Sequence, residues 1–75
     1  MKLSERRKKK GLTQTELGLL LEVSQQQVAK YEAGTSIPSK AVIYKIMKAL
    51  ELTPAEVWEM FYGDETEEGG NENEV

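Results

Sequence analysis

The sequence predicts an all-α protein whose single domain is built from five short helices. Three observations favour this class: polar N-cap residues precede apolar residues at helical spacing, no segment alternates with the two-residue period of a strand, and the chain has only 75 residues. A chain of this length holds one domain at most. Its small core must be packed efficiently, because a short chain buries a modest share of its surface on folding.

Start and stop signals predict helices at about residues 2–10, 14–21, 25–33, 40–50 and 54–62. Gly11 ends the first helix, because glycine readily adopts the left-handed conformation found after helix C-termini. Thr13 is a typical N-cap residue, and Glu16 three positions later completes a capping box at the start of the second helix.

The third helix follows Ser24, where Gln27 is expected to complete another capping box. It carries Val28 and Tyr31 on one face and ends before Gly34, which is a second glycine terminator. The third helix is therefore short and amphipathic.

The fourth and fifth helices have clear start signals. Ser39 caps the fourth helix, whose apolar residues follow at i, i+3, i+4 and i+7. Thr53 at the N-cap, Pro54 at the first helical position and Glu56 at the third mark the start of the fifth helix.

The second and third helices are separated only by residues 22–24, so they must cross steeply. A close crossing favours a small residue at the contact, and Gly18 lies mid-helix, where glycine costs about 1 kcal/mol relative to alanine. The apolar residues expected to line the inside are Leu17, Leu21, Val23, Val28 and Tyr31. This is a helix-turn-helix arrangement, whose second helix can lie in the major groove of DNA.

Consecutive glutamines, Gln25, Gln26 and Gln27, begin the third helix, and Lys30 lies one turn further on. A glutamine amide offers a donor and an acceptor, and it can pair with adenine N6 and N7 in the major groove. The helix N-terminus and Ser24 suit a phosphate, because the backbone N–H groups there are free and carry partial positive charge. In an arbitrary helix, the same glutamines would simply form a solvated face.

The run GLTQTELGLLLEVSQQQVAKYEAG resembles the lambda-repressor/Cro-type helix-turn-helix family, also called the XRE family. The resemblance extends over about residues 3–61 and includes Leu12-Thr13-Gln14, Glu16-Leu17, Val23-Ser24, Val28, Glu32-x-Gly34, Pro38 and Leu50-x-Leu52-Thr53-Pro54. It implies a compact five-helix, lambda-repressor-like DNA-binding domain that reads the major groove with its third helix.

The resemblance also implies DNA contacts for the matched residues Gln14, Ser24, Gln25, Gln26, Gln27 and Lys30. Gln14 would bind a phosphate while bracing Gln25, and Ser24 would bind another phosphate. Gln25 and Gln26 would meet base edges, whereas Lys30 would contact a base or a phosphate and Gln27 would lie nearby.

Arg7 resembles the family arginine that pairs with the glutamate before x-Gly, which is Glu32 here. We expect a structural ion pair that holds the first helix against the third. If the pair is buried, loss of one partner would cost about 3–5 kcal/mol, whereas an exposed pair is worth about 0–1 kcal/mol.

Some residues depart from the family pattern. Glu22 stands in the turn where the family prefers glycine, so we expect strain or a different conformation there. Thr35 and Ser36 replace basic residues, which weakens phosphate contacts from that loop. Leu19 and Leu20 replace polar residues and are expected to be exposed.

The charge divides the chain into two parts. Residues 1–62 hold ten Lys and Arg against seven Glu, a net charge of +3, whereas residues 63–75 hold six acids and no base. The sequence therefore predicts a helix-turn-helix DNA-binding domain at 1–62 and a disordered acidic tail at 63–75, which has too few apolar residues to offset chain entropy. The tail either keeps the protein soluble or competes with DNA for the basic surface.

The last expected helix presents the aromatic residues Trp58, Phe61 and Tyr62. They either complete the core or form part of a dimer interface, because a chain this short is poorly able to cover all three. We expect a homodimeric regulator, a small repressor or autoregulator, that binds a palindromic double-stranded DNA operator. The alternative is an antitoxin or another protein-binding module on the same fold.

The composition argues against an enzyme. The chain has no His, no Cys and no Gly-rich phosphate loop, so we expect no catalytic residues, no metal site and no cofactor. No apolar run approaches the roughly 18 residues that a membrane span needs, so we expect no membrane association and a cytoplasmic location.

Overall fold

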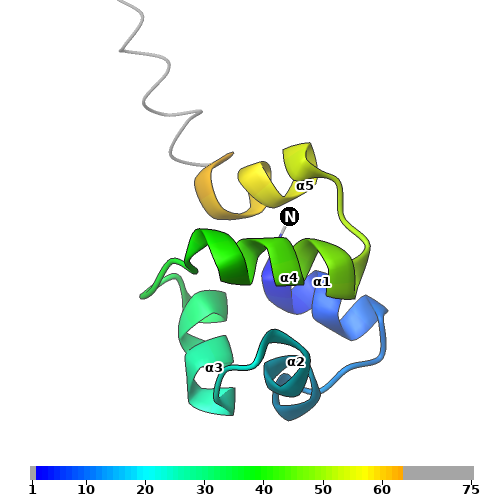
Figure 1. The fold of residues 1–75 in the computed structure, drawn as a ribbon, viewed down its shortest axis with the longest axis vertical. Helices are drawn as coiled ribbons and strands as arrows, with labels where there is room; N and C mark the ends of the chain where they lie inside the picture. Colours follow the sequence, from blue (N-terminus) through cyan, green and yellow to red (C-terminus); the bar gives the residue numbers. More distant parts are fainter. Residues whose placement is uncertain (1, 64–75) are drawn as a thin grey trace, which may run out of the picture.

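The computed structural model describes residues 2–63, which form five α-helices and one π-helical segment without any strand. In chain order these are α1 (Leu3–Lys9), α2 (Gln14–Leu21), α3 (Gln25–Ala33), α4 (Lys40–Leu50), α5 (Pro54–Trp58) and η1 (Glu59–Gly63). In Figure 1, α4 crosses the middle of the molecule, with α2 and α3 on one side and α5 and η1 on the other. The predicted all-helical class is confirmed. No helix within residues 2–63 is long and apolar enough to cross a bilayer.

Local signals explain where the helices begin. The side chains of Thr13, Ser24, Ser39 and Thr53 each accept a hydrogen bond from the backbone N–H three residues later. Glutamates complete capping boxes at the starts of α2 and α5, as the sequence predicts. Each cap satisfies backbone N–H groups that would otherwise lack a partner inside the helix.

Left-handed residues follow the ends of the first four helices. Gly11 and Gly34 adopt φ angles of 74° and 82° after α1 and α3. Glu22 and Glu51 take the same role after α2 and α4, with φ angles of 62° and 57°. The expected strain at Glu22 is therefore present as a left-handed non-glycine residue, and Glu51 repeats it.

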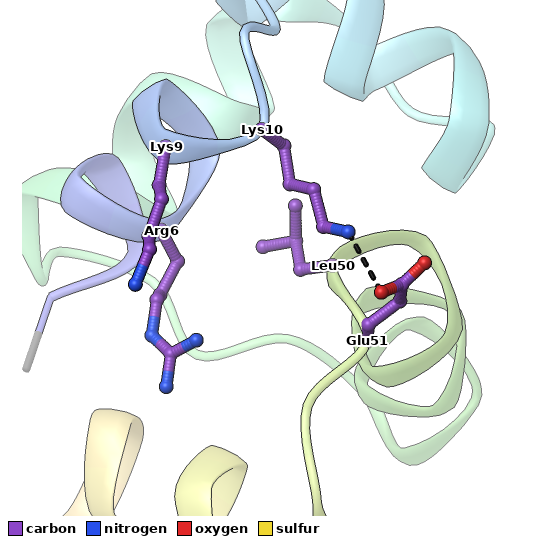
Figure 2. Close-up of a pocket in the computed structure, with 5 residues that line it drawn as sticks. All are labelled: Arg6, Lys9, Lys10, Leu50 and Glu51. Carbon is purple, nitrogen blue, oxygen red and sulfur yellow. Dashed lines mark ion pairs between the residues drawn. The ribbon is translucent and has the colours of Figure 1, made fainter.

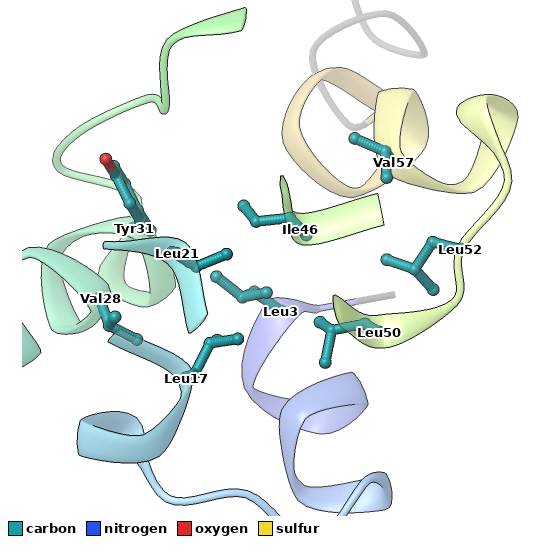
Figure 3. Close-up of a cluster of buried hydrophobic side chains, with 9 residues drawn as sticks. All are labelled: Leu3, Leu17, Leu21, Val28, Tyr31, Ile46, Leu50, Leu52 and Val57. Carbon is teal, nitrogen blue, oxygen red and sulfur yellow. The ribbon is translucent and has the colours of Figure 1, made fainter. Parts of the chain in front are cut away.

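The core gathers apolar side chains from every α-helix and from the turn between α4 and α5 (Figure 3). Its buried members are Leu3, Leu17, Leu21, Val28, Tyr31, Ile46, Leu50, Leu52 and Val57. Val23, which the sequence predicts on the inside, is half-buried and packs against this cluster. The core lies between the two sides of the molecule and fixes α3 relative to α2 and α4.

The end of the fifth helix differs from the prediction. The α-helix ends at Trp58, and the chain continues as the wider turn of η1. A Cβ atom on Gly63 would lie 2.6 Å from Cγ of Glu59, so glycine fits where the wide turn brings the chain back over Glu59. Gly63 therefore belongs to η1 and not to the predicted tail. The rest of that tail, residues 64–75, lies outside the described residues.

Candidate nucleic-acid interface

Gly18 sets the crossing between α2 and α3. A Cβ atom at this position would lie 2.8 Å from the carbonyl oxygen of Val23, and a backbone atom cannot yield without moving the whole turn. The backbone N–H of Val23 also donates to the carbonyl of Gly18 at 2.9 Å. The turn therefore closes directly onto the backbone of α2, which fixes the first residues of α3 in space.

The first turn of α3 exposes polar side chains. Ser24 Oγ accepts a hydrogen bond from the backbone N–H of Gln27 at 3.1 Å, while the side chains of Gln25 and Gln26 are exposed. The prediction that the Gln27 side chain completes a capping box is wrong. Its amide instead donates to Ser36 Oγ at 3.1 Å, because the loop after α3 brings that hydroxyl within reach.

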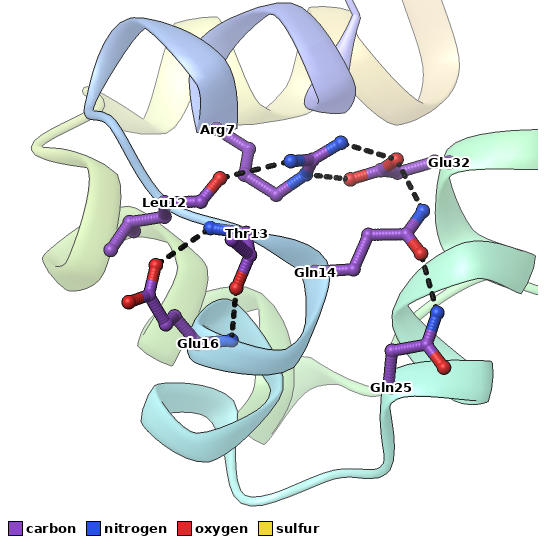
Figure 4. Close-up of polar contacts among 7 residues, drawn as sticks. All are labelled: Arg7, Leu12, Thr13, Gln14, Glu16, Gln25 and Glu32. Atoms are coloured by element: carbon purple, nitrogen blue, oxygen red, sulfur yellow. Dashed lines mark hydrogen bonds and ion pairs between the residues drawn. The ribbon is translucent and has the colours of Figure 1, made fainter.

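A chain of polar contacts joins α1, α2 and α3 (Figure 4). Arg7 donates from Nε to Glu32 Oε2 at 2.6 Å, from Nη2 to Oε1 at 3.3 Å, and from Nη1 to the carbonyl of Leu12 at 2.9 Å. Gln14 Nε2 donates to Glu32 Oε1 at 3.0 Å, and Gln25 Nε2 donates to Gln14 Oε1 at 2.6 Å. The ion pair that starts this chain is buried, with the Arg7 and Glu32 side chains only 10% and 9% exposed.

Glu32 is charged at neutral pH because its partners outweigh its burial. Burial alone would raise the pKa of Glu32, whereas the hydrogen bonds from Arg7 and Gln14 and the charges of Arg7 and Lys8 lower it. The result is a pKa below the ordinary value of 4.5. A carboxylate in this state can only accept hydrogen bonds.

Comparison with protein families identifies this arrangement. A family model described as helix-turn-helix, of the Cro/C1 type, matches residues 3–57. The chain belongs to the Cro/C1-type helix-turn-helix family. This XRE family binds DNA and is typically non-enzymatic, so the chain is a DNA-binding helix-turn-helix regulator. Comparisons with curated proteins and with solved structures gave no significant match.

In this Cro/C1-type chain, the exposed face of α3 continues beyond the glutamines. Lys30 is exposed and lies one helical turn after Gln26, so the two residues share a face. Gln27 is half-buried beside that face. Glu22, in the turn before α3, forms an ion pair of 3.2 Å with Lys45 on α4. All the residues implied in DNA contact lie on α3, at its N-cap or at the adjacent start of α2: Gln14, Ser24, Gln25, Gln26, Gln27 and Lys30.

Trp58, Phe61 and Tyr62 belong to α5 and η1, which lie on the opposite side of α4 from α2 and α3 (Figure 1). Trp58 is 58% exposed, and its ring lies 4.4 Å from that of Tyr62 at an interplanar angle of 32°. Phe61 is half-buried and packs against the core. A groove of about 350 Å³ between α4 and α5 is lined by Pro38, Lys40, Ile43, Met47, Pro54, Val57, Trp58 and Tyr62.

A basic pocket of about 290 Å³ lies between α1 and the turn after α4 (Figure 2). Arg6, Lys9 and Lys10 contribute its positive charge. Arg6 donates to Glu56 at 2.8 Å, and Lys10 forms an ion pair with Glu51 at 2.9 Å. The ion pairs of Arg6 and Lys10 hold α1 against α5 and the turn after α4. The sequence does not predict this structural role, because the partners are far apart along the chain.

Proposed function

We propose that the chain is a sequence-specific regulator that reads the major groove of a palindromic DNA operator with α3, working as a homodimeric repressor or autoregulator. The observation that carries this proposal is the exposure of Gln25 and Gln26 at the start of α3, with the Gln25 amide braced by Gln14 at 2.6 Å. An exposed amide held in a fixed direction suits base readout, because its donor and acceptor can pair with one base edge.

The proposed contacts divide into base contacts and phosphate contacts. Gln25 and Gln26 meet base edges, since they lie on the first exposed turn of α3. Ser24, the free N–H groups beside it and Gln14 bind phosphates and set the register of the helix. Lys30, one turn further along α3, contacts a base or a phosphate.

Gln27 has a different role in this proposal. Its amide N–H donates to Ser36 Oγ at 3.1 Å, so it holds the loop after α3 beside the DNA while its carbonyl oxygen stays available for a contact. Thr35 and Ser36 are neutral, so this loop contributes weaker phosphate contacts than a basic loop.

The homodimer is proposed to form through Trp58, Phe61 and Tyr62. A tryptophan that is 58% exposed beside an apolar groove of about 350 Å³ is typical of a surface that is covered by a partner. Two copies on a twofold axis would read half-sites about 34 Å apart or a multiple of that distance. Sedimentation of the chain and of Trp58→Ser tests this step: we expect a dimer for the first and a monomer for the second.

The decisive test is selection of bound sequences from a random duplex pool with the full-length chain. We expect a consensus of two half-sites with regular spacing. Gln25→Ala and Gln26→Ala should each weaken binding by about 1–3 kcal/mol and relax specificity at one position. Tyr44→Ala on α4 is the neutral control and should leave the consensus unchanged. An equal loss of binding to selected and random DNA would show that the glutamines do not read bases.

A second candidate function follows from α2. Leu19 and Leu20 are 74% and 52% exposed, as expected from the sequence, and they form an apolar surface beside the turn. An antitoxin or another protein-binding module could use such a surface. If the folded chain selects no DNA consensus, the protein-binding function is favoured. Leu19 and Leu20 would then be the residues to change.

A further inference from the structure

The hydrogen bonds between Glu32 and Gln25 run in one direction (Figure 4). Gln14 Nε2 donates to Glu32 Oε1 at 3.0 Å, and Gln25 Nε2 donates to Gln14 Oε1 at 2.6 Å. Each amide therefore turns its nitrogen inward, toward the ion pair. The Gln14 carbonyl faces outward, toward the start of α3.

A carboxylate is the group that fixes this direction. A glutamine amide can be turned either way in a hydrogen-bond chain, because its two ends are nearly equal in size. Glu32 cannot, since a carboxylate only accepts, and Arg7 holds it in place with donors at 2.6 and 3.3 Å. Gln14 must therefore offer Nε2 to Glu32 and Oε1 to Gln25, and Gln25 must answer with its own Nε2.

The direction determines which atoms of Gln25 remain for a ligand. One Nε2 hydrogen is used on Gln14, so Oε1 and the second Nε2 hydrogen stay free as an acceptor and a donor on one edge. Adenine offers the matching N6–H donor and N7 acceptor, whereas guanine offers two acceptors, O6 and N7. Reversed hydrogen bonds would turn Gln25 Oε1 inward onto Gln14 and the NH₂ group of Gln25 outward. The two N–H donors of that group would then face the base, where they match the two acceptors of guanine.

We propose that Glu32 is a positioning residue that selects adenine over guanine at the base facing Gln25, without touching DNA itself. This inference rests on the proposed role of Gln25 as a base-reading side chain. Glu32 acts by fixing the orientation of the Gln14 and Gln25 amides. It makes no proposed contact with DNA itself.

Glu32→Gln should reverse the direction of the hydrogen bonds that run between residues 32, 14 and 25, for the same reason. Arg7 Nε makes the shorter bond, to Oε2 at 2.6 Å, so the amide oxygen of the variant stays there. Its NH₂ group takes the place of Oε1, at the cost of the longer bond of 3.3 Å from Arg7 Nη2. That NH₂ group faces Gln14 and requires an acceptor, so Gln14 turns its Oε1 inward. Gln14 Nε2 then donates to Gln25 Oε1, and Gln25 presents donors to the base.

The experiment measures binding of the full-length chain to two versions of its selected operator. They carry adenine or guanine at the position where Gln25→Ala relaxes specificity. We expect the wild-type chain to prefer adenine by about 5- to 150-fold, the range of one bidentate base contact. Glu32→Gln should bring that ratio to parity or to a preference for guanine. Glu51→Gln makes the same chemical change outside the chain of contacts and should keep the wild-type ratio.

The double variant Gln14→Glu with Glu32→Gln provides the rescue. A carboxylate at position 14 accepts from both neighbours, so Gln25 again turns its Nε2 inward and adenine is again preferred. The ratio is the readout, because a carboxylate near the DNA backbone weakens binding to both operators alike. Failure of the double variant to restore the adenine preference would overturn the inference.

Two further measurements keep the inference testable if Glu32→Gln does not fold. Gln14→Met removes the brace at a half-buried surface position, and it should bring the adenine-to-guanine ratio toward parity. Coupling across the hydrogen bond, measured by NMR without DNA, should join Gln25 Nε2 to Gln14 Cδ in the wild-type chain.

The outcomes separate the two proposals. If Gln25→Ala relaxes no position, base reading and the role of Glu32 fall together. If it relaxes one position but Glu32→Gln and Gln14→Met keep the full adenine preference, only the role of Glu32 is overturned. A coupling in the opposite direction in the wild-type chain would overturn it as well.

Discussion

The turns that follow α2 and α4 are built alike and lead to different surfaces. Each helix ends at a buried leucine, Leu21 or Leu50, and each continues with a left-handed glutamate, Glu22 or Glu51. In both turns the residue after the glutamate donates its backbone N–H to a carbonyl five residues earlier at 2.9 Å. The same local solution therefore terminates both helices.

The two turns differ in the start of the helix that follows them. Ser24 leads into Gln25 and the exposed amides of α3, whereas Thr53 leads into Pro54 and the aromatic end of the molecule. The residue that accepts the backbone hydrogen bond of the turn differs as well. It is Gly18 in the first turn, where the backbones approach closely, and Met47 in the second. Turn geometry alone thus does not decide what the following helix can contact; the first exposed residues after its N-cap do.

Gly18→Ala should have the largest effect, because it breaks the first turn alone. The added Cβ lies 2.8 Å from the Val23 carbonyl, so we expect a loss of about 2 kcal/mol in the free energy of unfolding. Urea denaturation measures this loss. The adjacent, exposed Leu19→Ala is the control and should change stability by less than about 0.5 kcal/mol. An unchanged midpoint for Gly18→Ala would mean that the turn can open at no cost.

Removing the N-caps separates stability from DNA binding. Ser24→Ala and Thr53→Ala each lose the same cap bond, so each should cost about 1 kcal/mol of stability. Only Ser24→Ala should also weaken binding to the operator, since Ser24 is the cap proposed to contact a phosphate. Equal losses of DNA affinity in the two variants would contradict that assignment.

Replacing the left-handed glutamates should stabilise the protein slightly. Glycine avoids the steric cost of a left-handed side chain, although it gains freedom in the unfolded chain, so Glu22→Gly should add about 0.5–1 kcal/mol. Glu51→Gly should shift the urea midpoint in the same direction. Ala29→Gly in the middle of α3 is the opposite control and should lose about 1 kcal/mol. A loss of stability in both glutamate variants would show that their ion pairs matter more than backbone strain.

The smallest expected effect is a change in acid sensitivity. The hydrogen bond from Lys10 and the charge of Lys10 hold the pKa of Glu51 below its ordinary value of 4.5. Because the pKa is lower in the folded state, the contribution of Glu51 is complete above pH 4.5 and is lost as the pH falls through the folded-state pKa. Glu51→Gln should therefore be slightly less stable at neutral pH and converge with the wild-type chain in acid. Parallel stability curves would argue against this.

The sequence predicts the starts of α2, α4 and α5 because their signals are local. Thr13, Ser39 and Thr53 each act on a backbone N–H three residues away, so no knowledge of the rest of the fold is needed. The end of α5 and the wide turn of η1 could not be predicted, because they depend on how the chain returns at Gly63 over Glu59.

The candidate site is predictable in part for the same reason. The glutamines at the start of α3 are visible in the sequence, and the resemblance implies that Gln14 braces Gln25. The bond from Gln27 to Ser36 could not be inferred, since it spans nine residues and depends on the loop after α3. The bond from Gln14 to Glu32 joins residues 18 positions apart and requires the packing of α2 on α3.

The exposed surface of α3 that is proposed to read bases carries little charge, which has a consequence for counterions. Lys30 is the one lysine of α3, which has no arginine, and the exposed residues that precede it in the helix, Gln25 and Gln26, are uncharged amides. Each phosphate neutralised by a protein cation releases condensed counterions, which makes the binding constant fall by roughly the 0.9 power of salt concentration per contact. With so few cations on the helix proposed to enter the groove, we expect a shallow dependence on ionic strength and weak attachment to random DNA. Occupancy of the operator would then follow the abundance of the protein and change little with the ionic conditions of its surroundings.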